Sequence, residues 1–588
     1  MVRNPTAGIV IYNYKERGGS VDISSQQTEK IYITKSIMSI GTAKNKSSPS
    51  GKFEITLAPT KNWISEISIG SWIEIHMSPK VLTQSDLEAS SIETLKLIGM
   101  IDSVRMSVSV DQSTGARITT YSIVGRDWGA ALESYVYVDS AITDRNDSPL
   151  EAALRLGFAK LFLSLKEQAW AGKFSSSNLV MKIISYWGIS SISNSKNQKE
   201  VAQRILPQTN TGQQKPSPEV GSFDKFLNQS NKSAISKSVN ISRYAPISEF
   251  LLPIELSNKI DAKMNSLAKS IKLIDGRLIK YNMYSGDEME SVGLIDPQRI
   301  IGTNTLWQLL NVHCNDVVNE LVADLRWPNE KAYPEFALYK RIKPFWLPNQ
   351  ATKTPGGDPK IKSSFFNVRK VNISKQHVLS IETGDNAEDI INFIEIVPQV
   401  PAGYDVDIAV LATAKNKSAT HDPASFARYG IKPMFYSTLF FPASSKGGPE
   451  MSALDRWLPV LRGWFFDCHK MLNGTVTIIG QNNYIGVGDN ILMDSEIFGD
   501  LNYVKEEVGK KPSDIKILAH VQSVSHRFSY IENGSRSFVT TISFVRGIMT
   551  DAKGENLIGS KSFGIATESS DVKDKSRSNV SYKDEATK

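Results

Sequence analysis

The chain has 588 residues, well beyond the length at which a single hydrophobic core stops growing, so about three or four domains are expected. Hydrophobic residues make up 40% of the chain, an ordinary share for a globular protein, and no stretch approaches the roughly 18 apolar residues of a membrane span. The formal net charge of +7 is mild over this length and argues against a nucleic-acid-binding surface.

The N-terminus and the cysteines indicate where the chain is made. Residues 1–5 open no apolar signal-peptide core, so synthesis in the cytosol is expected. The two cysteines, Cys314 and Cys468, lie far apart in sequence, each in a predicted helix. Buried free thiols are therefore favoured over a disulfide, which implies a reducing compartment.

Residues 1–140 are predicted to form strands. Segments 9–12, 31–33 and 53–57 are rich in β-branched and aromatic residues and are separated by Gly, Ser, Lys and Pro, a pattern typical of a barrel or sandwich. Polar residues 111–115 predict the loop of an exposed antiparallel ribbon. The motif Gly125-Arg126-Asp127-Trp128-Gly129 ends this unit, and we expect Arg126 and Asp127 to form a structural ion pair there.

Residues 141–303 change to a helical and loop-rich pattern. Ser148-Pro149-Leu150-Glu151 combines an N-cap, a proline at the first helical position and a glutamate at the third. Segment 190–238 is dominated by Ser, Asn, Gln, Lys and Pro and predicts a long loop, and 261–274 predicts another helix. The whole region is interpreted as an insertion on a β scaffold.

The next block predicts a helix and two strands. Residues 304–310 begin a helix containing Trp307, and Asn319-Glu320-Leu321 opens a strand that runs to residue 325. A second strand covers residues 334–341 and ends at Pro344-Phe345.

An aromatic helix precedes the last strands. The segment Tyr429-Gly430-Ile431-Lys432-Pro433 comes first, and Ser452 and Asp455 are candidate caps of the helix that follows it. One apolar stripe predicts that Trp457 and Trp464 are buried and that the helix ends at Asn473-Gly474, before a strand over 475–480. The stripe consists of Leu454, Trp457, Leu458, Leu461, Trp464, Phe465 and Cys468.

One pattern occurs twice, about 420 residues apart. A Gly-polar turn (Gly70-Ser71, later Gly488-Asp489) leads into a strand, and two further strands follow at matching distances. The turn glycine precedes a Ser-Val pair by 33 residues in the first copy (Ser103) and 35 in the second (Ser523), and a later serine follows after 19 and 20 residues. We interpret this as one β unit used twice, so that a ring of three chains would present six similar surfaces.

The order of these segments resembles the baseplate hub proteins of contractile-tailed bacteriophages and the related late control protein D and VgrG-type hubs. In those proteins a Trp-containing helix runs into an Asn-Glu-Leu strand, a second strand ends in Arg and Pro-Phe, and an aromatic-Gly-hydrophobic-basic-Pro segment follows. The resemblance covers roughly residues 1–140 and 304–550. The insertion is longer than the short helical connection that the family leads us to expect.

The resemblance implies an α+β, mostly β fold with two homologous antiparallel β-barrel domains and an intervening α/β domain. The expected domains are 1–140 (first barrel), 141–303 (insertion), 304–450 (α/β, gripping the spike), 451–550 (linking helix and second barrel) and 551–588 (polar, partly disordered tail). It also implies a structural homotrimer in the virion tail baseplate, assembled in the host cytoplasm. Its partners would be the tail tube protein, the central spike and other baseplate proteins. It would adapt six-fold to three-fold symmetry during genome ejection, with no membrane insertion.

Catalytic and metal motifs are absent from the sequence. There is no HExxH, Walker A, GxSxG or CxxC segment, and no cofactor or metal site is predicted. The neighbours Cys468 and His469 point in different directions on a helix, and His520 and His526, beside the second ribbon, are expected to have surface roles. Two alternatives remain: a hub with an embedded peptidoglycan hydrolase, for which only the insertion has room, and a receptor- or carbohydrate-binding tail protein.

Overall fold

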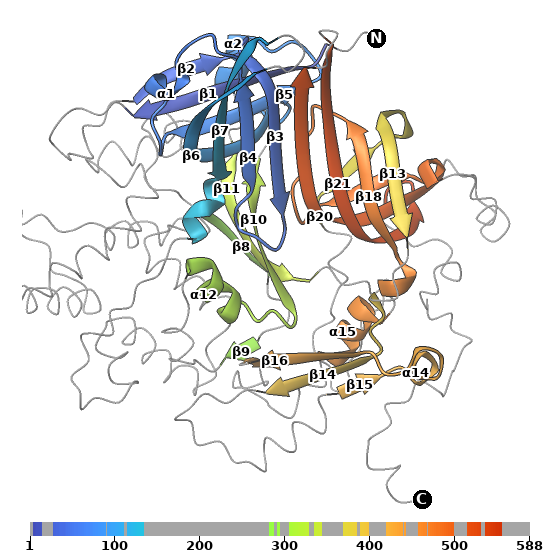
Figure 1. Ribbon diagram of the computed structural model, residues 1–588. Helices are drawn as coiled ribbons and strands as arrows, with labels where there is room; N and C mark the ends of the chain where they lie inside the picture. Colours follow the sequence, from blue (N-terminus) through green and yellow to red (C-terminus); the bar gives the residue numbers. More distant parts are fainter. Residues whose placement is uncertain are drawn as a thin grey trace, which may run out of the picture.

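A computed structural model of the chain is mostly antiparallel β-sheet with few helices (Figure 1). It describes residues 4–14, 28–89, 91–110, 115–133, 281–286, 291–293, 305–327, 334–343, 368–384, 389–398, 419–438, 440–442, 457–466, 468–498, 514–530 and 535–554. None of the helices in these ranges is long and apolar enough to cross a membrane. The predicted α+β, mostly β class is confirmed.

The first β unit is a seven-stranded antiparallel sheet in the order β3-β4-β7-β6-β5-β1-β2. Alternate residues face its core, so that on β4 Phe53, Ile55 and Leu57 are buried and the residues between them are not. Two short helices, α1 (Trp63–Glu66) and α2 (Gln84–Ala89), and a 3-10 helix, η2 (Trp128–Glu133), accompany the strands. The strands are β1 (Thr6–Tyr14), β2 (Thr28–Ile33), β3 (Ile37–Asn45), β4 (Lys52–Leu57), β5 (Trp72–Ser78), β6 (Leu95–Val110) and β7 (Arg117–Asp127).

The second β unit has six strands in the order β13-β18-β21-β20-β19-β12. Two of them, β12 and β13, precede the predicted domain boundary at residue 451 but pair with the strands that follow it. The 3-10 helices η6 (Lys375–His377) and η10 (Ser495–Phe498) flank the strands. The strands are β12 (Lys370–Ile373), β13 (Val378–Gly384), β18 (Leu472–Ile479), β19 (Asn490–Asp494), β20 (Ile515–Tyr530) and β21 (Arg536–Asp551).

The two β units match strand by strand. β3, β4, β7, β6, β5 and β1 correspond in order to β13, β18, β21, β20, β19 and β12, and only the last pairing differs, since β1 lies antiparallel to β5 while β12 lies parallel to β19. Irregularities recur at matching places: one between Ile101 and Ser103 on β6 and one between Val521 and Ser523 on β20. The strands that carry Val104 and Val524 therefore occupy equivalent positions.

The Gly-polar turns make the same hydrogen bonds in both units. Gly70 N donates to Ile101 O at 2.8 Å, and Gly488 N donates to Val521 O at 3.0 Å. Both glycines have a positive φ (82° and 78°), which a residue with a Cβ rarely adopts. The residue after each glycine accepts a bond from the same partner, Ile101 N or Val521 N, at 2.9 Å.

One cross-strand pair contains a phenylalanine and a glycine in both units, but the two residue types lie on opposite strands. Phe53 on β4 lies opposite Gly125 on β7, whereas at the equivalent position Gly474 on β18 lies opposite Phe544 on β21. Both phenylalanines are buried. Each unit therefore pairs one phenylalanine with one glycine across these two strands, although the phenylalanine comes from the opposite strand, so the summed side-chain volume of the pair is the same.

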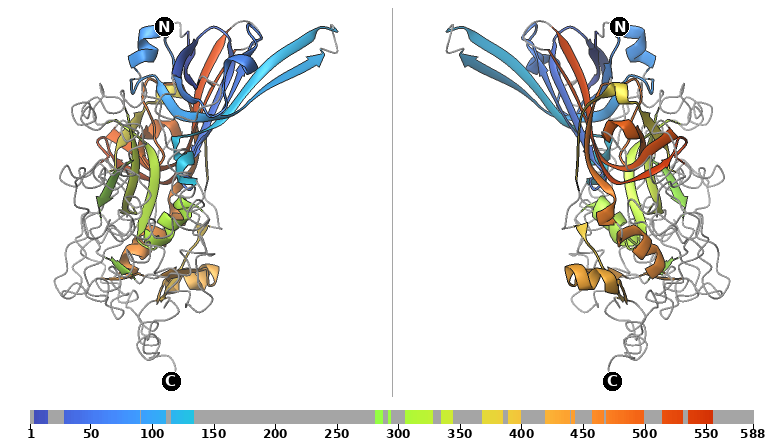
Figure 2. Two further views of the ribbon diagram at one scale, coloured as in Figure 1. Left: turned by 90° about the vertical axis from the view of Figure 1, so that its left-hand side faces the viewer. Right: turned by 90° about the vertical axis from the view of Figure 1, so that its right-hand side faces the viewer.

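Among the described residues, the strand pairing does not close either unit into a barrel, so the two predicted β-barrel domains are not confirmed. Instead, residues 523–529 of β20 pair with residues 39–45 of β3 and join both units into one sheet. The physical reason is that β6 and β20 are long strands: their inner halves pair with β5 and β19, and their outer halves extend past them. Figure 2 shows the β6–β7 ribbon reaching out from the body.

The predicted helix and strands around the Asn-Glu-Leu segment are confirmed. Helix α12 (Leu306–His313) starts with a capping box between Thr305 and Gln308. Strands β10 (Asn319–Arg326) and β11 (Glu335–Ile342) are antiparallel, and β8 (Tyr281–Gly286) joins β11 in parallel. A strand also forms at β9 (Ser291–Gly293), so the few described residues of the insertion are strands; its predicted helices lie outside the described residues.

Below these strands lies a smaller α/β part (Figure 1). Strand β14 (Phe393–Pro398) pairs with β15 (Ala419–His421) and β16 (Pro433–Thr438), and β17 (Phe440–Pro442) pairs with β9. The predicted Tyr-Gly-Ile-Lys-Pro segment links helix α14 (Pro423–Tyr429) to β16 through Gly430, which has a positive φ of 71°.

The aromatic helix is shorter than predicted. Helix α15 covers Leu458–Phe465, a 3-10 helix η9 follows at Cys468–Lys470, and strand β18 already starts at Leu472, so the predicted helix end at Asn473-Gly474 is wrong. Those two residues pair with β13 instead. Residues 451–456, with the predicted caps Ser452 and Asp455, lie outside the described residues.

The predicted burial of Trp457 and Trp464 is confirmed: their side chains are 1% and 3% exposed. The Arg546 guanidinium of β21 lies 3.7 Å from the centroid of the Trp464 ring, and Arg546 Nε donates to Trp464 O at 3.4 Å. Burial lowers the pKa of Arg546. Trp464 thus anchors α15 to the second β unit.

Replacement of Trp464 by alanine should lower the free energy of unfolding by roughly 3–5 kcal/mol, because it opens a cavity and removes the ring from a buried cation. Urea denaturation measures this loss. Trp464→Phe is the control and should lose clearly less. An alanine variant as stable as the parent would show that the helix is not anchored through this ring.

Candidate functional site at the junction of the two β units

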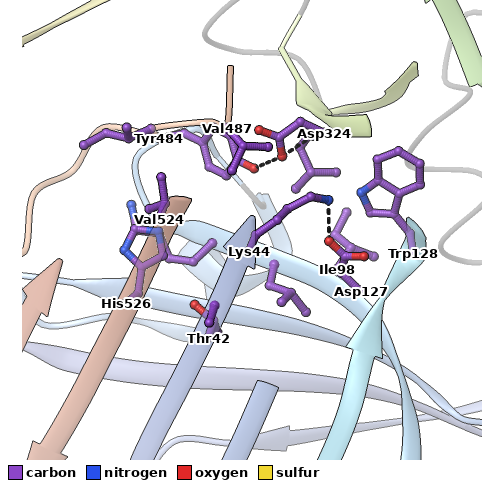
Figure 3. Close-up of a pocket in the computed structure, with 15 residues that line it drawn as sticks. Thr42, Lys44, Ile98, Asp127, Trp128, Asp324, Tyr484, Val487, Val524 and His526 are labelled. Carbon is purple, nitrogen blue, oxygen red and sulfur yellow. Dashed lines mark hydrogen bonds and ion pairs between the residues drawn. The ribbon is translucent and has the colours of Figure 1, made fainter. Parts of the chain in front are cut away.

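Polar residues gather where the two β units meet strand β10 (Figure 3). They come from the end of β3, the end of β7, the middle of β10 and the loop that precedes β19. Most of these residues are buried. A buried charge is costly unless an opposite charge or a hydrogen-bond partner lies close to it.

The first partnership is between Lys44 and Asp127. Lys44 Nζ donates to Asp127 Oδ2 at 2.5 Å, and their side chains are 12% and 5% exposed. Lys44 Nζ also lies 5.0 Å from the centroid of the Trp128 ring. Burial raises the pKa of Asp127, and Lys44 counteracts this rise.

The glycines of the Gly-Arg-Asp-Trp-Gly motif allow this arrangement. A Cβ on Gly129 would lie 1.9 Å from Pro49 O, and a Cβ on Gly125 would lie 2.1 Å from Met100 O. Gly129 N also donates to Asp127 Oδ1 at 2.9 Å. Any side chain at either position would push the end of β7 away from its neighbours.

The predicted ion pair between Arg126 and Asp127 is wrong. Adjacent residues of a strand point to opposite faces, and Arg126 turns to the exposed side, where Nε donates to Asp102 Oδ2 at 2.9 Å and Nη1 to Glu133 Oε2 at 3.4 Å. Asp127 turns inward to Lys44.

A second partnership joins β10 to the loop before β19. Tyr484 Oη donates to Asp324 Oδ1 at 2.5 Å, and the Trp327 and Tyr484 rings have centroids 4.6 Å apart. Burial raises the pKa of Asp324 to about 6 despite the nearby Lys44 and the Tyr484 hydrogen bond. Burial and the Asp324 charge also raise the pKa of Tyr484.

A third set of contacts involves the Asn-Glu-Leu segment at the start of β10. Glu320 accepts a hydrogen bond from Lys46 Nζ at 2.8 Å, and His520 Nε2 lies 3.3 Å from the same Lys46 nitrogen. Asn319 Nδ2 donates to Cys314 O at 3.0 Å, and Leu321 is buried. Strand β10 therefore contacts both units at their joint, since Lys46 follows β3 and His520 lies on β20.

The predicted surface roles of His520 and His526 are wrong. Both side chains are buried, His520 Nδ1 lies 2.9 Å from Asn490 Oδ1, and His526 Nδ1 lies 2.9 Å from Thr540 Oγ1. Burial lowers the pKa of His526 to about 3. Both residues lie on β20, the strand that joins the two units.

The cavity between these groups is small. Lys44, Asp127, Asp324, Tyr484 and His526 line a space of about 30 Å³ (Figure 3). A single water needs roughly 10–15 Å³ on this scale, so the cavity has room for about one or two waters. The site can hold the units together but has no room for an organic substrate.

The cysteines are free and buried, which confirms their predicted state. No group of three His, Cys, Asp or Glu side chains within the described ranges is placed to hold a metal ion. Sequence reasoning missed Lys44, Asp324 and Tyr484, because nothing in their local sequence distinguishes them from other polar residues; only pairing between distant strands brings them together.

Comparison with known proteins finds matches among solved structures alone. No family model and no curated protein matches the chain. Among solved structures, it is similar to the tail protein from Neisseria meningitidis MC58, with 9% identity, a TM-score of 0.36 and coverage of 92% of this chain and 96% of that one.

Two further structures are similar at the same level. The 43 kDa tail protein of prophage MuSo2 from Shewanella oneidensis has 12% identity and a TM-score of 0.36, with 92% of this chain and 98% of that one covered. The Francisella PdpA–VgrG complex has 8% identity and a TM-score of 0.34, with 92% and 53% covered. At TM-scores this low, the function has to be argued from the residues of this chain.

The raised pKa of Asp324 makes stability depend on pH. Between the unfolded value of 3.8 and the folded value of about 6, the Asp324 carboxyl is more protonated in the folded chain than in the unfolded chain, so this group lowers stability as pH rises through that interval. Asp324→Asn should remove that part of the slope, a difference on the order of 1–3 kcal/mol between pH 4 and 7.

Denaturation of the parent and of Asp324→Asn at a series of pH values measures this difference. The comparison isolates Asp324, because His526, whose folded pKa is depressed, contributes an opposite slope equally in both proteins. The exposed carboxylate Glu54, replaced by glutamine, is the control. Parallel pH profiles for parent and Asp324→Asn would contradict the account of this pair.

Proposed function

We propose that the chain is the structural baseplate hub of a contractile phage tail, a homotrimeric adaptor between the six-fold tail tube and the three-fold central spike. The observation that carries the proposal is the duplication: two β units in one chain share strand order, turn hydrogen bonds and strand irregularities. Three such chains supply six nearly equivalent units, a number that matches a six-fold partner on one side and a three-fold partner on the other.

The junction supports a structural role. Its charged groups are buried and are partnered by one another, and its cavity of about 30 Å³ is too small for an organic substrate. The resemblance of the segment order to tail hubs points to the same class of protein. In this proposal the tail tube, the spike and other baseplate proteins are the partners, and the chain acts in genome ejection as part of the virion.

The carbohydrate-binding alternative finds less support. Sugar-binding surfaces expose aromatic rings, but Trp72, Trp128 and Trp307 are all buried, as are Trp457 and Trp464. Trp72 and Trp128 pack against Phe336 of β11, at centroid distances of 6.5 and 4.8 Å. These rings hold β11 to the first β unit.

The assembly is testable by native mass spectrometry. The purified chain, with and without its neighbouring spike protein, should give a species with three copies of the chain, because duplication matches six-fold symmetry only in a trimer. Light scattering provides an independent mass. A stable dimer or hexamer of the chain under both conditions would contradict the proposal.

The hydrolase alternative has its own test. The purified chain should leave peptidoglycan intact in a turbidity assay, since its sequence contains no recognised catalytic motif. A heat-denatured sample is the control. Reproducible lysis that a substitution within residues 141–303 abolishes would overturn the purely structural role.

A further inference from the structure

The outer half of β6 is an open strand edge. Only residues 95–100 of β6 pair with β5, so residues 103–110 have a neighbour, β7, on one side only among the described strands. Met106, Val108 and Val110 alternate along this half and are 51%, 52% and 59% exposed. An open edge with apolar side chains is a template for another strand.

The equivalent half of β20 is already covered. Residues 523–529 of β20 pair with β3 of the first unit, and Phe528 lies opposite Ile40. Both side chains are buried in the core of the first unit, at 2% and 0% exposed. Val108 is the counterpart of Phe528, so two equivalent positions differ in burial because a strand covers one of them and none covers the other.

The counterpart of β3 also has an open edge. Strand β13 corresponds to β3, and among the described strands it pairs only with β18. The correspondence extends to sequence and shape: Ile37-Met38-Ser39-Ile40 matches Val378-Leu379-Ser380-Ile381, and both strands have an irregularity between the first and third of these residues.

We propose that the outer half of β6 in one copy of the chain pairs antiparallel with β13 of a second copy, repeating between chains the β20–β3 joint found within the chain. This inference rests on the proposed function, for which it supplies the contact between copies. Each copy would offer one β6 edge and one β13 edge, so the contact is heterologous and a closing rotation generates a ring.

The in-chain joint fixes the register of the proposed one. Phe528 pairs with Ile40 and Arg527 with Gly41, so their counterparts place Val108 opposite the partner's Ile381 and Ser107 opposite the partner's Glu382. The full set of expected pairs is Arg105–Gly384, Met106–Thr383, Ser107–Glu382, Val108–Ile381 and Ser109–Ser380.

Side-chain chemistry fits this register on both faces. Val108 meets Ile381, which already packs against the second unit's core, so the two cores become continuous across the contact. On the other face, Arg105 lies diagonal to Glu382, within reach of a long side chain. A shift of one residue would place Val108 on Glu382 and lose both contacts.

Disulfide trapping tests the pairing. The full chain carries Ser107→Cys with Glu382→Cys, or Val108→Cys with Ile381→Cys; adjacent antiparallel pairs alternate in spacing, so one of the two has the closer geometry. Mild oxidation of the assembly, with the spike protein where assembly needs it, should convert most of the chain into covalent dimers and larger species on a non-reducing gel.

Three controls accompany this experiment. Arg527→Cys with Gly41→Cys, the in-chain counterpart, should cross-link within one chain. Arg105→Cys with Ser380→Cys, four residues out of register, should not cross-link. A mixture of the two single variants, Ser107→Cys and Glu382→Cys, should give covalent dimers and nothing larger, because each copy then has one engineered thiol; the native cysteines are buried.

The outcomes separate this inference from the proposed function. Cross-linking at the expected pairs supports the inference. A trimer by native mass spectrometry without cross-linking at either pair, or with cross-linking only out of register, overturns the strand pairing and leaves the hub proposal standing. A chain that stays monomeric with and without the spike overturns both.

Discussion

The antiparallel pairing of β20 with β3 is the contact on which the rest of the molecule depends. It joins two similar sheets, places Phe528 of the second unit in the core of the first, and leaves the outer half of β6 and strand β13 each with one neighbour among the described strands. Because β20 is a long strand, its inner half pairs with β19 of its own unit and its outer half pairs with β3 of the first unit.

Polar groups reinforce this joint at its inner end. Lys44, near the end of β3, pairs with Asp127 of β7, and Lys46, just after β3, pairs with Glu320 of β10. A buried charge without a partner costs several kcal/mol, so these pairs restrict how the units and β10 can meet more than they add stability. Asp324 of β10 and Tyr484 of the loop before β19 form a further buried hydrogen bond at the same end of the joint.

The sequence predicted what local patterns determine. Alternation and turn chemistry identified most strands of both units, and the apolar stripe identified the burial of Trp457 and Trp464. Spacing alone identified the duplication, and the structure adds hydrogen bonds that agree atom by atom. The length of α15 was overestimated, because apolar residues continue past its end into 3-10 helix and strand.

Contacts between distant segments could not be predicted in this way. Lys44 and Asp127 are 83 residues apart, and Lys46 and Glu320 are 274 apart, so no local spacing relates them. The match of residues 37–40 with 378–381 was a usable signal: it assigns β13 to the second unit and would have moved the predicted boundary at residue 451 toward the N-terminus. The role of Arg126 was misjudged because strand alternation, once β7 is placed, sends it away from Asp127.

In the proposed assembly, the duplicated β unit lets three chains present six similar surfaces. Electron cryomicroscopy of the assembled chain with its spike tests it most directly. We expect a ring in which first and second β units from three chains alternate around a pseudo-six-fold axis, with β6 of each copy beside β13 of the next. A ring in which only the first units surround the axis, or in which those two edges stay open, would contradict it.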